Sequence, residues 1–108
     1  MSTSTNVVEP LISELADDPD ILDLVNEFVD ELPKRAEAIV ACGAAEDLAT
    51  IRTLAHQLKG SAGGYGFPAI TDAAAKVEQS ARGNAELAVI TEQINELATL
   101  CQRARAGA

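Results

Sequence analysis

The stretch AEDLATIRTLAHQLKGSAGGYG, residues 45–66, decides the fold. Its apolar residues recur every three or four positions, which is the repeat of an amphipathic helix with one buried face. The repeat predicts a helix from Ala45 to Gly63, which the glycines at 63–66 bring to an end because glycine is a poor helix former. The predicted core residues are Leu48, Ile51, Ala55, Leu58, Ala62 and Tyr65.

The segment before it shows the same repeat. A helix is predicted from the turn at 17–20 to Cys42, with Asp18 as N-cap, Pro19 in the first turn and Gly43 as C-cap. Pro33 lies inside this helix and should bend it. The predicted core residues are Ile21, Val25, Phe28, Leu32 and Ile39.

Two more helices are predicted after the glycine cluster. Pro68 opens the first of them, and the break at 82–84 separates it from the second, for which Asn84 is the expected N-cap. Their predicted core residues are Ile70, Ala74, Val77 and Ala81, followed by Leu87, Ile90, Ile94, Leu97 and Cys101.

The predicted fold class is all-α. Hydrophobic residues make up 47% of the chain and aromatic residues only 3%, so the core is built from small aliphatic side chains that favour helix packed on helix. Short connections predict an antiparallel up-and-down four-helix bundle. We also expect a short additional N-terminal helix over 8–15 at one end. Residues 1–108 are expected to form a single domain, with 1–7 disordered and 106–108 a frayed tail.

Charge and hydrophobicity argue against several classes of function. The formal net charge is −9, which disfavours binding to nucleic acid or to an anionic membrane surface. No stretch approaches the roughly 20 apolar residues of a membrane span, and the N-terminus lacks the basic and apolar regions of a secretion signal. The sequence therefore predicts a cytoplasmic protein.

His56 is the only histidine. With Ile51 at the centre of the buried face and about 100° per residue, the His56 ring lies about 140° away, at or beyond the edge of the bundle. Arg52, Lys59 and Gly63 lie at about 80–120° and Gly60 at about 180° by the same count. The predicted face is exposed, locally cationic and bare on its C-terminal side.

This face suits a covalent carrier better than a complete catalyst. A neutral imidazole is a good nucleophile near neutral pH, and Lys59 would offset negative charge on a phosphoryl group attached to it. Glycine at 60 would leave room for a visiting macromolecule. The face supplies no oxyanion hole, general acid or set of metal ligands. A lone histidine on a helix is more often an ordinary surface residue, but the glycines and Lys59 favour the functional interpretation.

The run HQLKGSA, residues 56–62, resembles the signature of histidine-containing phosphotransfer (Hpt) domains, His-x-Leu-Lys-Gly-Ser/Ala-Ser/Ala. The resemblance extends from about Asp18 to Cys101. It includes Glu31-Leu32-Pro33 before the signature helix and Gly66 after it. The double glycine at 63–64 departs from many family members, so we expect the helix to be loose or to end early there.

The resemblance implies a function. Such domains accept a phosphoryl group on the histidine from a phospho-aspartate of a receiver domain and pass it to another receiver. His56 would be phosphorylated on the nitrogen distal to the backbone, Lys59 would neutralise the phosphoryl charge, and Gly60 would clear space for the receiver. Family members commonly hold the other ring nitrogen with Gln or Glu about 22 positions on, which here is Glu78.

Partners and cofactors follow from the same resemblance. The expected partners are response-regulator receiver domains or a hybrid histidine kinase, which would dock over Arg52, Gly60 and Gly63. Phe67 and the short first helix are candidates for apolar docking contacts. The chain is expected to be a monomer without cofactor or metal of its own, since the receiver would bring the Mg²⁺.

Three alternatives stay open at this point. The chain could be a helical adaptor that binds receivers or kinases without carrying phosphate. It could be the phosphorylatable module of a kinase, although no nucleotide-binding sequence is present and kinase activity of its own is not expected. A metal or haem bundle is weaker still, because one histidine and two cysteines without ligand spacing leave the ligand set incomplete.

Overall fold

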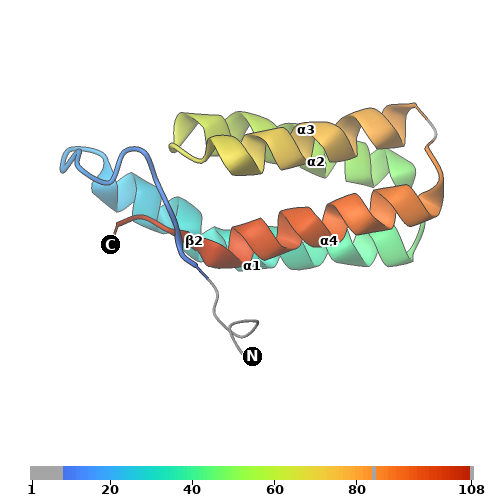
Figure 1. Ribbon diagram of the computed structural model, residues 1–108, viewed down its shortest axis with the longest axis horizontal. Coiled ribbons are helices and arrows are strands. Elements are labelled where there is room, and N and C mark those ends of the chain that lie inside the picture. Colours follow the sequence, from blue (N-terminus) through green and yellow to red (C-terminus); the bar gives the residue numbers. More distant parts are fainter. Residues whose placement is uncertain (1–8, 84, 108) are drawn as a thin grey trace, which may run out of the picture.

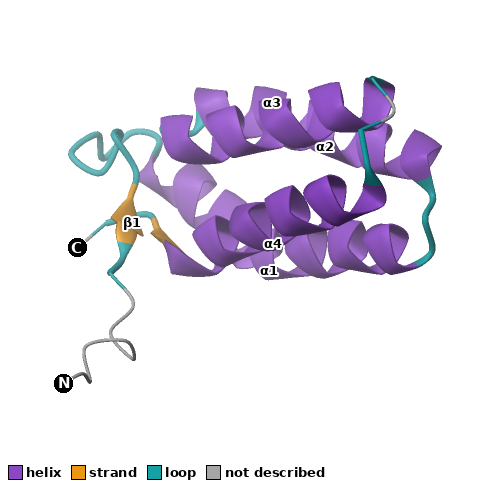
Figure 2. Cartoon of the chain, turned by 45° about the vertical axis from the view of Figure 1, so that its right-hand side comes forward, coloured by secondary structure: helices purple, strands orange, loops and turns teal. Residues whose placement is uncertain are grey.

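The computed structural model describes residues 9–83 and 85–107, and within them the chain forms four helices and two very short strands (Figures 1 and 2). The predicted helical bundle is confirmed. In chain order the elements are β1 (Leu11–Ile12), α1 (Leu22–Ala44), α2 (Leu48–Gly64), α3 (Pro68–Arg82), α4 (Leu87–Arg103) and β2 (Ala104–Arg105).

The helices lie in two layers. Helix α2 packs most extensively on α3, and α1 packs most extensively on α4. Figure 1 shows the α2–α3 pair above the α1–α4 pair. Its colours show α1 leading away from the end that holds β2, α2 returning toward it, α3 leading away and α4 returning. Each layer thus offers one face to its partner layer and one to solvent.

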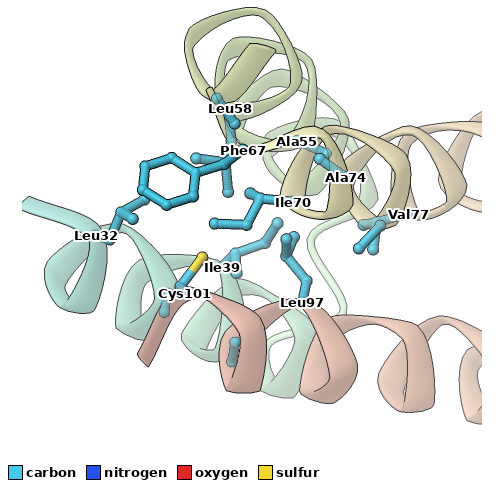
Figure 3. Packing of buried hydrophobic residues seen from close by; sticks show 14 of the residues in the cluster. Leu32, Ile39, Ala55, Leu58, Phe67, Ile70, Ala74, Val77, Leu97 and Cys101 are labelled. Atoms are coloured by element: carbon cyan, nitrogen blue, oxygen red, sulfur yellow. The ribbon is translucent and has the colours of Figure 1, made fainter. Parts of the chain in front are cut away.

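Between the layers lies the hydrophobic core (Figure 3). Leu32 and Ile39 reach it from α1, and Leu97 and Cys101 reach it from α4. All the core positions predicted for the helix over 45–63 lie in α2 or just after it, and four of them are buried (Ile51, Ala55, Leu58 and Ala62). Leu48 and Tyr65 are half-buried at its two ends.

Helix ends differ from prediction by a few residues. The N-cap of α1 is Ile21 rather than Asp18, and the Asp18 carboxylate accepts a hydrogen bond from the Asp20 amide in the turn before it (3.0 Å). Helix α2 starts later than predicted because Asp47 caps it, accepting from the Thr50 amide at 3.2 Å. Glu86 precedes α4, and the predicted cap Asn84 lies outside the described residues.

Gly43 is not the C-cap of α1, which continues to Ala44 and is capped by Ala45. A Cβ added at Gly43 would lie 3.1 Å from the Ile94 side chain of α4. The small residue is therefore explained by the close approach of α1 and α4. Helix α1 also runs without interruption through Pro33.

The predicted short N-terminal helix is wrong for the described residues, while Val8 lies outside them. Leu11 and Ile12 form β1, which pairs in parallel with β2. The Ser13 amide donates to the Arg105 carbonyl at 3.0 Å, and the Arg103 side chain donates to the Glu9 carbonyl at 2.7 Å. Pairing with a distant segment overrides the local helical preference. We call these contacts between the two chain ends the terminal clamp.

The predicted tail over 106–108 begins immediately after β2, where Ala106 is buried and 5% exposed. Strand β2 continues directly from α4 and pairs with β1. Ala108 and residues 1–7 lie outside the described part of the chain.

The N-terminal segment crosses the turn between α2 and α3. Gly66 in this turn has φ +85°, a left-handed conformation that favours glycine. Its carbonyl accepts from the Glu14 amide at 2.9 Å, and the Ser13 hydroxyl donates to the Tyr65 carbonyl at 2.7 Å. Phe67 follows and is fully buried (0% exposed), so it cannot be the predicted docking residue. Figure 3 shows its ring between the layers, beside Leu32.

Candidate functional site

The outer face of α2 carries the side chains that the sequence placed there. The His56 side chain is 67% exposed, and Arg52, Gly60 and Gly63 are exposed as well. The Lys59 side chain, at 35%, is half-buried. The face is exposed because the opposite side of α2 is fixed in the core. The ring of His56 is thus open to solvent on a helix whose orientation the core determines.

Glu78 of α3 lies against this ring. Its side chain is only 5% exposed, and its Oε2 lies 2.9 Å from Nδ1 of His56. An ionised carboxylate can only accept a hydrogen bond, so Nδ1 carries the proton and donates it. In the neutral ring the lone pair then lies on Nε2, the nitrogen distal to the backbone. The Glu78 contact therefore selects the tautomer in which the outer nitrogen is nucleophilic.

Two cations share the same carboxylate. Nζ of Lys59 donates to Oε1 of Glu78 at 2.6 Å, and Nη2 of Arg82 donates to Oε2 at 3.0 Å. A buried carboxylate is stable only when it is paired and hydrogen-bonded. Here both of its oxygens have charged donors. Glu78 with His56, Lys59 and Arg82 form what we call the Glu78 cluster.

The Glu78 cluster keeps the carboxylate ionised. The hydrogen bond from Lys59 is the largest influence that holds the pKa of Glu78 below its ordinary value of 4.5, against the opposing effect of burial, and the His56 contact acts in the same direction. Glu78 is therefore a permanent negative charge at neutral pH, as an orienting partner for the ring must be.

The glycines of α2 serve two different purposes. A Cβ added at Gly60 would meet no atom within 4 Å, whereas one added at Gly63 would lie 3.3 Å from Oγ1 of Thr71 on α3. That hydroxyl donates to the Lys59 carbonyl at 3.0 Å and is thus held in place. Gly60 faces open space, while Gly63 lets α2 and α3 approach closely. The helix does not end early at the double glycine, since it continues to Gly64.

A protein-family model described as "Hpt domain" matches residues 23–107, most of the chain. The chain belongs to the Hpt domain family. Membership implies phosphotransfer in two-component relays in general. Comparisons with curated proteins and with solved structures each gave no match. The residues matched begin in α1 and include the whole Glu78 cluster.

Two hollows flank the ring in this Hpt domain. An open depression of about 510 Å³ lies between α2 and α3, lined by His56, Arg52, Glu78 and Arg82 among others. A mainly apolar groove of about 240 Å³ lies between α1 and α2 on the other side of Gln57. Its lining residues are Lys34, Arg35, Ala38, Ile39, Leu54, Gln57 and Leu58. The ring thus lines a depression that also contains Arg52 and Arg82, while the apolar groove on the other side of Gln57 includes Lys34 and Arg35 in its lining.

Sequence reasoning missed Arg82. The signal was present, because Glu78 and Arg82 are four residues apart on one helix, a spacing that brings side chains together. It was overlooked because Arg82 was assigned to the break between helices, whereas it is the last residue of α3.

Two further properties of the described residues concern membranes and metals. No helix in the described part of the Hpt domain combines the length and apolarity needed to cross a membrane. Within residues 9–83 and 85–107, no three or more His, Cys, Asp or Glu side chains are grouped to hold a metal ion.

Proposed function

We propose that this Hpt domain is a phosphoryl carrier in which His56 accepts a phosphoryl group from the phospho-aspartate of a receiver domain and passes it to another receiver. The observation that carries the proposal is the contact of Nδ1 with Glu78, which leaves Nε2 as the available nitrogen on a ring that is 67% exposed. The domain carries the group and has no kinase activity of its own.

The proposed chemistry is a direct displacement at phosphorus. The Nε2 lone pair forms the new N–P bond while the bond from phosphorus to the aspartyl oxygen breaks, and the aspartate leaves as a carboxylate. The ring becomes cationic in this step because Nδ1 keeps its proton. Glu78 lies 2.9 Å from that nitrogen and stabilises the developing charge. The reverse displacement hands the group to the next receiver.

Lys59 is the residue proposed to offset the phosphoryl charge. Its ammonium group is held on Glu78 at 2.6 Å, and its side chain is 35% exposed. The flexible Lys59 side chain therefore contacts the same carboxylate as the ring, and it can turn from there toward a phosphoryl group on Nε2. Glu78 would still hold Arg82 after such a turn.

The receiver is proposed to dock over the face around His56. Gly60 offers open space at the centre of this face, and Arg52 and Gly63 lie at its rim. The groove between α1 and α2 replaces Phe67 as the source of apolar contacts, and its lining includes Lys34 and Arg35. These two basic residues, in a chain of net charge −9, are complementary to the acidic residues that hold Mg²⁺ in a receiver. The domain is proposed to act as a monomer.

The test is transfer of a radioactive phosphoryl group from a phosphorylated receiver domain to the purified protein. We expect a base-stable, acid-labile label on His56, and complete loss of that label in His56→Gln. A label that persists in the variant would contradict the assignment of His56. If the protein binds the receiver and signals equally well with His56→Ala, it is an adaptor and the carrier proposal is wrong.

A further inference from the structure

The Glu78 cluster contains one more cation than an orienting carboxylate requires. Oε2 of Glu78 accepts from both Nδ1 of His56, at 2.9 Å, and Nη2 of Arg82, at 3.0 Å. Lys59 occupies the other oxygen at 2.6 Å. Arg82 therefore shares a single acceptor atom with the imidazole, although Lys59 already pairs with the carboxylate.

A carboxylate that faced only the imidazole would create a difficulty for a phosphoryl acceptor. An anion in contact with a histidine favours the protonated, cationic ring. The imidazolium has no lone pair on Nε2 and cannot attack phosphorus. The same Glu78 that orients the ring would thus tend to inactivate it by drawing a second proton onto it.

The cations of the cluster oppose that second proton. With a neutral ring the cluster holds one negative and two positive charges, so protonation of His56 would add a third positive charge around one buried carboxylate. The charged groups facing Glu78 and the ring are Lys59 and Arg52 from α2 and Arg82 from α3. Among the described residues, α1 and α4 contribute no ion pair to Glu78 and no residue to the depression.

Arg82 is the cation that can remain in place during transfer. Lys59 is proposed to turn toward the phosphoryl group, which would leave Oε1 without its donor. Arg82 reaches Glu78 from four residues along the same helix, so its contact depends on no other element. A carboxylate that is 5% exposed needs such a lasting partner.

We propose that Arg82 is a positioning residue for the phosphoryl acceptor: by sharing Oε2 of Glu78, it keeps the carboxylate paired and opposes a second proton on the His56 ring, which must be neutral to act as a nucleophile. This inference rests on the proposed function for its biological meaning. The physical effect can nevertheless be measured on the unphosphorylated protein alone.

The experiment is a pH titration of the imidazole by NMR, in which the single histidine gives one unambiguous set of ring signals. In Arg82→Gln the titration midpoint of His56 should move to higher pH, because the ring loses a neighbouring positive charge that opposes its protonation. Arg82→Lys should restore most of the shift, because it keeps the charge. Lys76→Gln, which removes a positive charge elsewhere on α3, is the matched control and should leave the midpoint in place.

Two further measurements separate the possible outcomes. In a Glu78→Gln background the shift caused by Arg82→Gln should fall to less than half, because the shared acceptor has lost its charge. The pH at which phosphoryl acceptance is half-maximal should follow the ring titration. An unchanged or lower midpoint in both Arg82→Gln and Arg82→Ala would overturn the proposal. If the midpoint shifts but the parent protein accepts no phosphoryl group, the inference on Arg82 stands and the proposed function fails.

Discussion

At Gly60, one turn before the end of α2, an added Cβ would meet nothing within 4 Å, whereas at Gly66 it would lie 2.5 Å from the Ser13 hydroxyl and 2.9 Å from the Glu14 amide nitrogen. Both glycines belong to the same helix and turn, yet their surroundings differ. One leaves room for a molecule that arrives from outside, and the other leaves room for the chain's own N-terminal segment. Substitutions at the two positions should therefore damage different properties.

The largest effect is expected at Gly60. Gly60→Gln places a bulky side chain next to the ring on the proposed docking face, and we expect phosphoryl transfer to fall by about 100-fold or more. Stability should stay the same or rise by up to about 1 kcal/mol, because glutamine is the better helix former. Transfer kinetics with a phosphorylated receiver, together with urea unfolding, measure both.

Gly64→Gln is the matched control for this change. Gly64 is also exposed, also has nothing within 4 Å, and lies one turn further from His56. Transfer should be much less affected there. A Gly60→Gln protein that accepts phosphoryl at the normal rate would show that clearance at this position has no role.

At Gly66 the expected effect is on the fold. Gly66→Ala forces a side chain into a left-handed conformation and against the backbone of the N-terminal segment, so we expect a loss of about 3 kcal/mol in the free energy of unfolding. The change should appear as a lower urea midpoint with an unchanged slope. An alanine variant as stable as the parent would mean that residues 13–15 do not lie over this turn.

The smallest effect is expected at Gly63. The space around an added Cβ there, with the Thr71 hydroxyl at 3.3 Å, is intermediate between the open space at Gly60 and the clash at Gly66. Gly63→Ala gains helix propensity of about 1 kcal/mol but crowds the Thr71 hydroxyl, so the net change in stability should be less than about 1 kcal/mol. In a Thr71→Ala background the crowding disappears, and Gly63→Ala should then stabilise by about 1 kcal/mol. Calorimetric unfolding of the four proteins checks this. If the substitution gains nothing in the Thr71→Ala background, contact with Thr71 does not explain the glycine.

The four helices and the exposure of His56 could be predicted from the sequence because both depend on local periodicity. A stripe of apolar residues fixes which side of α2 is buried, and the azimuth of every other residue follows from it. Glu78 was found differently, through the resemblance to Hpt domains, because no local pattern links a residue on α3 to the ring on α2.

What the sequence could not predict depends on contacts between distant segments. Residues 11–12 form a strand because they pair with 104–105. Phe67 is buried because it lies between the two helix layers. The left-handed residue after α1 is Glu46 (φ 56°), although glycine would be the usual choice. In each case a neighbour far along the chain, or the path of the turn, outweighs the local preference of the residue.

The terminal clamp has a consequence for the order of folding during synthesis. His56 and Glu78 are 22 residues apart, so the hairpin that holds the site closes a short loop. Leu11 pairs with Ala104, far along the chain, and that strand has nothing to pair with until residues 104–105 have been translated and have left the ribosome. We therefore expect the nascent chain to assemble the hairpin of α2 and α3 first and to form the terminal clamp later.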